Sequence, residues 1–379
     1  MPELYAIDLP QGPALMEAIA DLWDAGHAVS VLDPRWGSSA RSNALTALQA
    51  TKLIDRDGTI SDLDGMASDP GDALVVLTSG SLASPKAAVL TMEAVTASAH
   101  ATSTALNVDP ARHRWLCCLP TSHIGGLSVI ARAIVTATPC TVIERPEPEA
   151  LARESRRGAT HVSLVATVLS RIDSSLFERI VIGGAAPPGH VDANVVCTYG
   201  MTETGSGVVY DGITLPGVEI TIEEPDAAGV GEILVRTPTA LRSYRDRPAP
   251  FVRGPDGSGE WLATGDAGRL NEVGLLEVRG RLAEVIVTGS EKVFPGDVEH
   301  IITAMPGVGE VAVWKRPDPV WGERVVAWVV PSADEPPSLD AIRTRVREEL
   351  APYAAPRELE IVTELPRTAI GKLQRRALS

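Results

Sequence analysis

The sequence predicts an α/β protein with a large N-terminal α/β domain that includes a β-rich subdomain, followed by a small mobile α+β domain. Three observations predict this architecture. Short apolar runs alternate with helical patterns up to about residue 205, an order typical of a largely parallel sheet. Candidate strands, turn residues and glycines then dominate 208–279. After Arg281, strands and helices alternate over about 100 residues, the size of a small domain.

Hydrophobic periodicity predicts the elements in order. In the first part, helical patterns cover 14–24 and 44–53, and a helix begins near Thr91. Strands are expected within 27–34 and 72–80, and at 115–119, 141–143, 159–164 and 179–182. In the last part, helices are expected at 297–303 and 339–350, with strands at 308–314, 324–330 and 357–361. The boundary is placed at Gly280, which gives domains of residues 1–279 and 280–379.

Composition excludes several classes of function. The formal net charge of −15 argues against a nucleic-acid binder and against attachment to an anionic membrane surface. The apolar stretch 127–143 is too short to span a bilayer, and the acidic, proline-broken N-terminus does not resemble a signal peptide. None of the four cysteines lies in a C-x-x-C pair, so neither a zinc site nor a disulfide framework is expected, and a cytoplasmic location follows. Nothing in the sequence indicates an oligomeric state.

Two segments in the first part of the chain carry residues suited to nucleotide chemistry. The loop TSGSLASPK, residues 78–86, follows a buried strand and offers hydroxyls, backbone N–H groups and one cation to phosphates. It is not a Walker A loop, because Pro85 and Ala87 occupy the second Gly and the Ser/Thr places. The segment TYGMTET, residues 198–204, offers an aromatic ring to a base, a hydroxyl to phosphate and a carboxylate to Mg²⁺.

Three further segments lie in the second part. Asp266 follows a tight turn in LATGD, residues 262–266, where its carboxylate can accept hydrogen bonds from ribose hydroxyls. GRLAE occupies residues 280–284 and is followed by VTGSEKVFP, residues 287–295. PRTAIGK, residues 366–372, ends in a lysine near the C-terminus. Alone, each of the five segments would also fit an ordinary turn, a strand end or a solvated charge.

Taken together in this order, the five segments resemble the adenylate-forming superfamily of acyl-CoA synthetases, luciferases and peptide-synthetase adenylation domains. The resemblance runs from about residue 30 to the end. It implies an active site between a large and a small domain, and it implies roles for individual residues. The implied nucleotide-binding residues are Thr78, Ser79, Gly80, Ser81 and Lys86 for phosphates, Gly183, Gly184, Ala185, Tyr199, Gly200 and Met201 around the adenine, Thr202 for phosphate, Glu203 for Mg²⁺, Asp266 and Arg281 for ribose, and Lys372 for the α-phosphate.

The chain departs from the superfamily pattern at several positions. Leu82 and Ala83 replace the usual Thr-Gly of the phosphate loop, and Ala283 stands where an Asp usually marks the hinge. Ala87 and Ser290 replace glycines. The phosphate loop also begins early, so the first N-terminal subdomain of larger relatives is expected to be missing or reduced.

The segments CLPTSHIGGL, residues 118–127, and TYGMTETGSGVVYDG, residues 198–212, are similar to those of compact o-succinylbenzoate–CoA ligases of menaquinone biosynthesis. The resemblance implies that His123, Gly125 and Gly126 border an acyl pocket and that Arg132 contributes a cation to it. The apolar neighbours of Arg132 favour a partly buried charge that needs an anion. A helix-capping histidine and a snorkelling surface arginine are the structural alternatives.

The expected reaction is ATP-dependent ligation of an acid to coenzyme A through an acyl-AMP intermediate, with ATP, Mg²⁺ and coenzyme A as the small-molecule partners. Catalysis would come from positioning and positive charge, with Lys372, Thr202 and Glu203 acting on phosphate. Two alternatives remain. One is a ligase for another aryl or acyl acid, or a ligase that passes the acyl group of acyl-AMP to a carrier protein. The other is a nucleotide-binding relative without catalysis, which the altered phosphate loop and Ala283 favour and which the presence of Glu203, Asp266 and Lys372 opposes.

Overall fold

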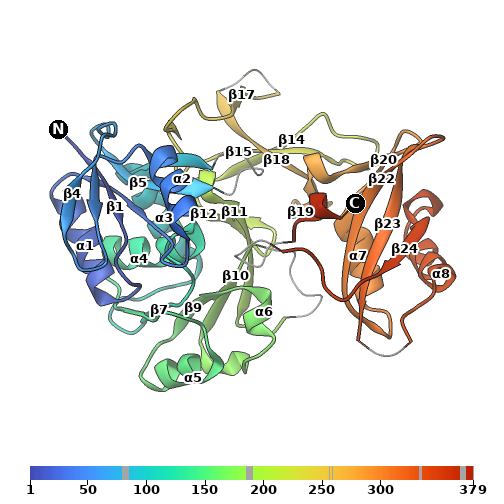
Figure 1. Ribbon diagram of the computed structural model, residues 1–379, viewed down its shortest axis with the longest axis horizontal. Coiled ribbons are helices and arrows are strands. Elements are labelled where there is room, and N and C mark those ends of the chain that lie inside the picture. The colour runs from blue at the N-terminus through green and yellow to red at the C-terminus, as the bar shows by residue number, and fades with distance from the viewer. Residues whose placement is uncertain are drawn as a thin grey trace. The chain divides into compact units, whose positions relative to one another are not determined.

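The computed structural model describes residues 1–78, 85–184, 191–255, 257, 259–332, 335–367 and 373–378. The chain, drawn as a ribbon in Figure 1, forms two units. Each unit has its own hydrophobic core. Unit 1 consists of Met1–Thr221, Leu234–Ala263 and Glu272–Leu276. Unit 2 consists of Ile222–Ile233, Thr264–Asn271 and Glu277–Ser379, so two short segments of the β-rich region join the C-terminal part of the chain.

The first sheet of unit 1 has seven strands in the order β16-β6-β5-β2-β1-β3-β4. Its middle strands β5, β2, β1 and β3 are parallel, whereas β4, β6 and β16 pair antiparallel at its two sides. Six of the seven residues of β5 are buried, as expected for a strand covered on both faces. The strands are β1 (Leu4–Ile7), β2 (Ala28–Val31), β3 (Lys52–Ile54), β4 (Ile60–Asp62), β5 (Asp72–Thr78), β6 (Lys86–Thr91) and β16 (Ser243–Tyr244).

The second sheet of unit 1 also has seven strands, in the order β13-β12-β11-β10-β9-β7-β8. Strands β8, β7, β9, β10 and β11 are parallel, and β12 and β13 continue the sheet antiparallel. The carboxyl ends of β10 and β11 therefore meet at one edge, where ligands of open α/β sheets bind. The strands are β7 (Trp115–Cys117), β8 (Cys140–Val142), β9 (His161–Leu164), β10 (Arg179–Ile182), β11 (Val195–Met201), β12 (Ser206–Tyr210) and β13 (Ile213–Thr214).

Two helices lie between these sheets. Helix α3 packs against β5 and β6 of the first sheet, α4 packs against β7 and β9 of the second, and the two helices pack against each other. Thr91 begins α3 as predicted, because its hydroxyl accepts a hydrogen bond from the Ala94 N–H at 3.1 Å. The helices of unit 1 are α1 (Pro13–Asp24), α2 (Ser38–Leu48), α3 (Met92–Ala105), α4 (Ile124–Val135), α5 (Pro148–Arg156) and α6 (Ala166–Leu169).

The α/β fold is confirmed, but two expectations about its elements are wrong. A single largely parallel sheet was expected, whereas two mixed sheets form. The helix expected at 44–53 is also misplaced: α2 ends at Leu48, Gln49 adopts a left-handed backbone with φ 50°, and Lys52–Ile54 pairs with β1. Pairing with a distant strand therefore overrides the local helical pattern.

In the region expected to be β-rich, 208–279, the described residues form strands joined by turns and loops. Besides β12 and β13, it contributes a five-stranded sheet in the order β14-β15-β18-β17, with β19 paired to β18. The strands are β14 (Glu219–Glu223), β15 (Gly231–Arg236), β17 (Phe251–Arg253), β18 (Glu260–Leu270) and β19 (Leu276–Arg281).

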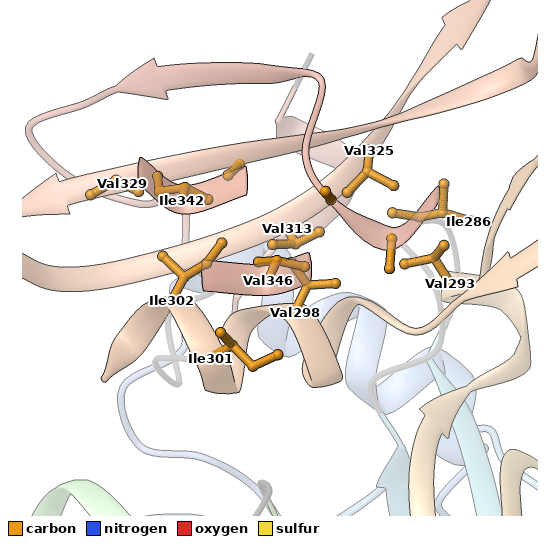
Figure 2. Packing of buried hydrophobic residues seen from close by; sticks show 13 residues of the cluster. Ile286, Val293, Val298, Ile301, Ile302, Val313, Val325, Val329, Ile342 and Val346 are labelled. Atoms are coloured by element: carbon orange, nitrogen blue, oxygen red, sulfur yellow. The ribbon is translucent and has the colours of Figure 1, made fainter. Parts of the chain in front are cut away.

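The C-terminal part of unit 2 contains a sheet of five strands and two helices, α7 and α8. The two helices pack against each other and contribute side chains to the apolar core on one face of the sheet (Figure 2). Alternate residues of β22 and β23 face this core, such as Val313 and Val325. The intervening Trp314 and Trp328 pack with Leu365 and Leu378 of the C-terminal segment. The elements are β20 (Ile286–Thr288), β21 (Glu291–Val293), α7 (Pro295–Thr303), β22 (Val308–Asp318), β23 (Gly322–Pro331), α8 (Leu339–Glu349) and β24 (Glu358–Ile361).

All four cysteines are free thiols; Cys117 and Cys118 are buried, and Cys140 and Cys197 are half-buried. Within the described ranges, no helix has the length and apolar character needed to cross a membrane.

Candidate active site

The expected phosphate loop connects two neighbouring strands. Thr78 ends β5 and Lys86 begins β6, and the two residues are register partners. Both therefore lie at the same edge of the first sheet. Ser79, Gly80 and Ser81, which lie between them, are outside the described residues.

The glycines expected near the adenine follow β10. The Thr198 hydroxyl on the neighbouring strand β11 donates to the Ile182 carbonyl at 3.0 Å. A Cβ at Gly183 would lie only 2.7 Å from that hydroxyl oxygen, and Gly184 has a φ of 84°, so both positions favour glycine. Ala185 lies outside the described residues.

The segment that carries Tyr199, Gly200 and Met201 ends β11 and leads into a 3₁₀ turn, η2 (Thr202–Thr204). Here β11 runs so close to β12 that a Cβ at Gly200 would lie 2.1 Å from the Ser206 carbonyl oxygen. The buried Thr204 hydroxyl accepts from the Met201 N–H at 3.0 Å and donates to the Ser206 carbonyl at 2.8 Å. These bonds fix the turn that presents Thr202 and Glu203.

Glu203 and Lys86 are connected by a residue that the motifs do not indicate. The Tyr244 hydroxyl donates to Glu203 Oε1 at 2.9 Å, and the Lys86 ammonium lies 5.2 Å from the centroid of the Tyr244 ring. The structure thus brings the end of the phosphate loop and the candidate metal ligand together within unit 1. Tyr244 reaches this place through pairing of β16 with β6, a long-range contact without a local sequence signal.

The expected acyl segment begins α4. His123 is the N-cap residue of the helix, and Gly125 and Gly126 lie in its first turn. A Cβ at Gly126 would lie 2.4 Å from the Leu119 carbonyl oxygen, so glycine allows the helix to start directly against the preceding loop.

Asp33, which the motifs also did not indicate, lies beside this segment. The Ser122 hydroxyl donates to its carboxylate at 3.3 Å, and Arg35 forms an ion pair with it at 2.6 Å. Burial opposes the charged form, but the hydrogen bonds from Arg35 outweigh it, so the pKa of Asp33 lies below its ordinary value. A buried carboxylate that remains ionised therefore adjoins the His123 segment.

Arg132 lies in the last turn of α4, nine residues or about 13 Å of helix rise beyond His123. Its side chain is buried, with its guanidinium carbon 4.6 Å from the centroid of the Trp115 ring. Among the described residues, its Nε and Nη1 have no hydrogen-bond partner, and burial lowers the pKa of Arg132. A cavity of about 10 Å³ adjoins Arg132 and is lined in part by Ser98, Ser128 and Gly205, the residue that follows η2.

The two expected ribose ligands meet in unit 2. Arg281 Nε lies 2.9 Å from Asp266 Oδ1, and Arg281 Nη1 donates to the Thr264 carbonyl at 3.0 Å. Asp266 is buried and follows Gly265, whose φ of 70° is a local irregularity within strand β18, so the tight turn expected at this position is wrong. This arrangement holds a carboxylate of β18 and a guanidinium at the end of β19 beside each other.

Lys372 lies outside the described residues, but the chain on both sides of it is held in unit 2. Arg367 and Leu373 form an isolated antiparallel bridge, and the Gln374 N–H donates to the Pro366 carbonyl at 2.8 Å. The Arg375 guanidinium pairs with Glu284 at 3.0 Å and with Glu299 at 2.7 Å.

The donor set around Glu203 fits Mg²⁺. In the parts of the chain that the structure describes, no group of three or more His, Cys, Asp or Glu side chains could hold a metal ion by itself. Mg²⁺ at phosphates is commonly held by one or two carboxylates, with the phosphate oxygens and water as its other ligands. Glu203 supplies one such carboxylate, beside the ends of the phosphate loop.

Comparisons with known proteins identify the family. Residues 61–245 match the AMP-binding enzyme family, and residues 297–372 match the AMP-binding enzyme C-terminal domain. The probable 2-succinylbenzoate–CoA ligase of Mycobacterium tuberculosis (strain ATCC 25618 / H37Rv) is 37% identical over 83% of this chain and 85% of the relative. The 2-succinylbenzoate–CoA ligase of Listeria monocytogenes serotype 4b is 34% identical over 81% of this chain and 69% of the relative.

A solved structure gives the same result. The o-succinylbenzoate CoA synthetase of Bacillus subtilis, in complex with an acyl-adenylate intermediate, superposes with a TM-score of 0.85. It is 26% identical, and the match covers 99% of this chain and 88% of that one. From these identities and this coverage, the chain belongs to the 2-succinylbenzoate–CoA ligase family of AMP-binding enzymes.

Proposed function

We propose that the chain is an ATP-dependent ligase that converts o-succinylbenzoate, ATP and coenzyme A to o-succinylbenzoyl-CoA, AMP and diphosphate, a step of menaquinone biosynthesis. The observation that carries this proposal is the 37% identity over most of both chains to a relative of that name. The arrangement of Lys86, Tyr244 and Glu203 supports it, because a cation and a carboxylate lie together where a nucleotide phosphate would bind.

In the first half-reaction, the substrate carboxylate attacks the α-phosphate and diphosphate leaves. Negative charge builds up on the phosphate oxygens, so the chain must supply cations and hydrogen-bond donors there. We assign Lys86 and Lys372 as cations and Thr202 as a donor. Mg²⁺ held by Glu203 would neutralise further phosphate charge. Asp266 and Arg281 would bind the ribose and so fix the nucleotide in position.

In the second half-reaction, the thiol of coenzyme A attacks the acyl carbonyl and AMP leaves. No enzyme thiol takes part in this scheme. Burial raises the pKa of Cys118 to about 12 and raises that of Cys117 well above its ordinary value, so neither supplies the thiolate that nucleophilic catalysis needs.

For the acid, we propose that the Arg132 guanidinium is the partner of the ring carboxylate. It is a buried cation with two N–H-bearing nitrogens left without partners among the described residues, beside a cavity that reaches Gly205. A desolvated carboxylate in turn requires a cation or several donors. His123, Gly125 and Gly126 would border the acyl pocket at the start of α4; they do not line the small cavity beside Arg132.

Exchange of labelled diphosphate into ATP tests this function directly. The purified chain is assayed with o-succinylbenzoate, benzoate, 4-phenyl-4-oxobutanoate and a short aliphatic acid. Exchange that depends on o-succinylbenzoate, followed by thioester formation with coenzyme A, is the expected result. Exchange with another acid alone would identify that acid as the substrate in place of o-succinylbenzoate. Absence of exchange with every acid would favour a relative that binds nucleotides without catalysis.

The remaining proposals concern partners and location. The net charge of −15 supports small-molecule partners over nucleic acid. The four free cysteines are compatible with the cytoplasm, where we place the protein.

A further inference from the structure

The segment 237–245 ties the candidate metal ligand to the strand that follows the phosphate loop. On one side, the Leu241 N–H donates to the Glu203 carbonyl at 2.8 Å, and the Thr239 hydroxyl donates to the Thr204 carbonyl at 2.9 Å. On the other side, β16 pairs with β6, and the Arg245 N–H donates to the Ala87 carbonyl at 2.9 Å. The segment therefore fixes η2 against the start of β6.

Tyr244 carries this connection into the side chains. It is buried, with 6% of its surface exposed, and its hydroxyl donates to Glu203 Oε1 at 2.9 Å. The face of its ring lies 5.2 Å from the Lys86 ammonium, within the range of a cation–π interaction. One aromatic side chain thus contacts a carboxylate and a cation whose spacing determines how a metal-bound phosphate can sit.

We propose that Tyr244 is a positioning residue for the metal–phosphate site. Its hydroxyl orients the Glu203 carboxylate so that the remaining oxygen lone pairs face the metal, and its ring holds the Lys86 ammonium beside them. Partners that orient a metal ligand in this way commonly change metal affinity by about 10- to 100-fold when they are removed. The inference rests on the proposed function to the extent that Glu203 binds Mg²⁺ there.

A purely structural role gives a different expectation. A buried tyrosine hydroxyl usually finds an acceptor, and losing that bond lowers stability without regard to any metal. A positioning role instead predicts that the defect depends on the Mg²⁺ concentration and largely disappears when Mg²⁺ is saturating. The two roles therefore differ in a quantity that can be measured.

The test is calorimetric binding of α,β-methylene-ATP to the full chain over a series of Mg²⁺ concentrations, with Tyr244→Phe compared with wild type. This substitution keeps the ring and removes only the hydroxyl. We expect the half-saturating Mg²⁺ concentration to rise by about 10-fold or more, with near wild-type analogue affinity at saturating Mg²⁺. Tyr244→Leu, which also removes the ring, should weaken analogue binding even at saturating Mg²⁺.

Tyr210→Phe is the matched control. Tyr210 is similarly buried, with 7% exposed, and its hydroxyl bonds Thr102 at 3.1 Å instead of a candidate metal ligand. Its Mg²⁺ dependence should equal that of wild type. An unchanged Mg²⁺ dependence in Tyr244→Phe, or an equal loss at every Mg²⁺ concentration, would overturn the proposal. Because no acid is present, this result is separate from failure of the proposed function, which wild-type diphosphate exchange reports.

Discussion

Arg132 is a buried cation whose partners do not account for its charge. Its guanidinium lies over Trp115, yet its Nε and Nη1 have no hydrogen-bond partner among the described residues. A desolvated cation–π contact contributes a stabilisation on the order of 2 kcal/mol, which is less than the desolvation penalty of several kcal/mol for a buried ion. A carboxylate bound against Arg132 would remove this imbalance, which is the physical reason to expect an anionic ligand there.

Arg132→Leu should therefore impair use of o-succinylbenzoate. We expect kcat/KM to fall by ~10- to 10³-fold, equivalent to roughly 1.4–4 kcal/mol, because the ring carboxylate loses its cation. Steady-state kinetics with 4-phenyl-4-oxobutanoate, the analogue that lacks the ring carboxylate, provides the control. That acid should be a poor substrate for wild type and should change little or improve in the variant. An equal loss for both acids would indicate damage to the fold and would contradict the assignment of Arg132 as the partner of the ring carboxylate.

His161 gives stability a pH dependence. It is buried at the start of β9, against the rings of Trp115 and His113. Burial, and next the nearby His113, lowers the pKa of His161 from 6.5 to about 4. Below pH 6.5 the unfolded chain therefore binds a proton that the folded chain does not bind until about pH 4. Stability is lost as pH falls across that window.

Urea unfolding at pH 7.5 and pH 5 measures this contribution. His161→Phe replaces the imidazole by a ring that does not titrate. The loss of unfolding free energy between the two pH values should be smaller in the variant by on the order of 1–2 kcal/mol. Other titrating groups affect both proteins alike. Identical losses in the two proteins would show that His161 already takes up its proton in the folded state.

At the scale of elements, Arg375 joins three segments of unit 2. It lies in η5 (Arg375–Ala377), and its guanidinium pairs with Glu284 in η3 (Leu282–Glu284) and with Glu299 in α7. Burial raises the pKa of Glu299 even though Arg375 acts in the opposite direction. The carboxylate therefore depends on its partner, and the pair anchors the segment that follows Lys372 beside the segment that contains the expected hinge residue Ala283.

Arg375→Ala should destabilise unit 2 and loosen this anchor. Leaving Glu299 buried without its cation costs about 3–5 kcal/mol in comparable pairs, and the partial exposure of both side chains places the expected loss at the lower end. Adding Glu299→Gln should restore part of the stability, because the uncompensated charge is then removed. Thermal unfolding of the single and double variants measures both effects.

Arg376→Ala is the control for Arg375, since it removes the same charge from the neighbouring, exposed position. It should leave the unfolding temperature nearly unchanged. If the two alanine variants unfold alike, or if Glu299→Gln gives no recovery, the ion pairs of Arg375 contribute little to the stability of unit 2.

Over the whole molecule, a feature could be predicted from the sequence when the interacting residues lie close together along the chain, and not when they are distant in sequence. The buried strand that leads into the phosphate loop and the helices of unit 2 could be predicted, because their signals are local in the sequence. Tyr244 could not, because it reaches Glu203 only through pairing of β16 with β6. The same limit explains the error at 44–53, where β3 exists because β1 is available as its neighbour.

The proposed reaction uses residues from both units of the chain. Lys372 belongs to unit 2, whereas Lys86 and Glu203 belong to unit 1. If Lys372 acts only on the α-phosphate, Lys372→Ala should lower acyl-AMP formation by at least ~10²-fold, about 2.7 kcal/mol of transition-state stabilisation. The reaction of presynthesised acyl-AMP with coenzyme A should remain nearly intact, because coenzyme A attacks the acyl carbon in that step and the five-coordinate charged phosphorus of the first step does not form.

Single-turnover measurements of the two half-reactions test this separation. Arg376→Ala again serves as the control, since it removes a nearby positive charge without an assigned role and should leave both rates close to wild type. A variant that loses both half-reactions equally would show that Lys372 supports the structure of the C-terminal segment. A variant that loses only the second would place the lysine at the thioester-forming step, where its charge would stabilise the phosphate of the departing AMP.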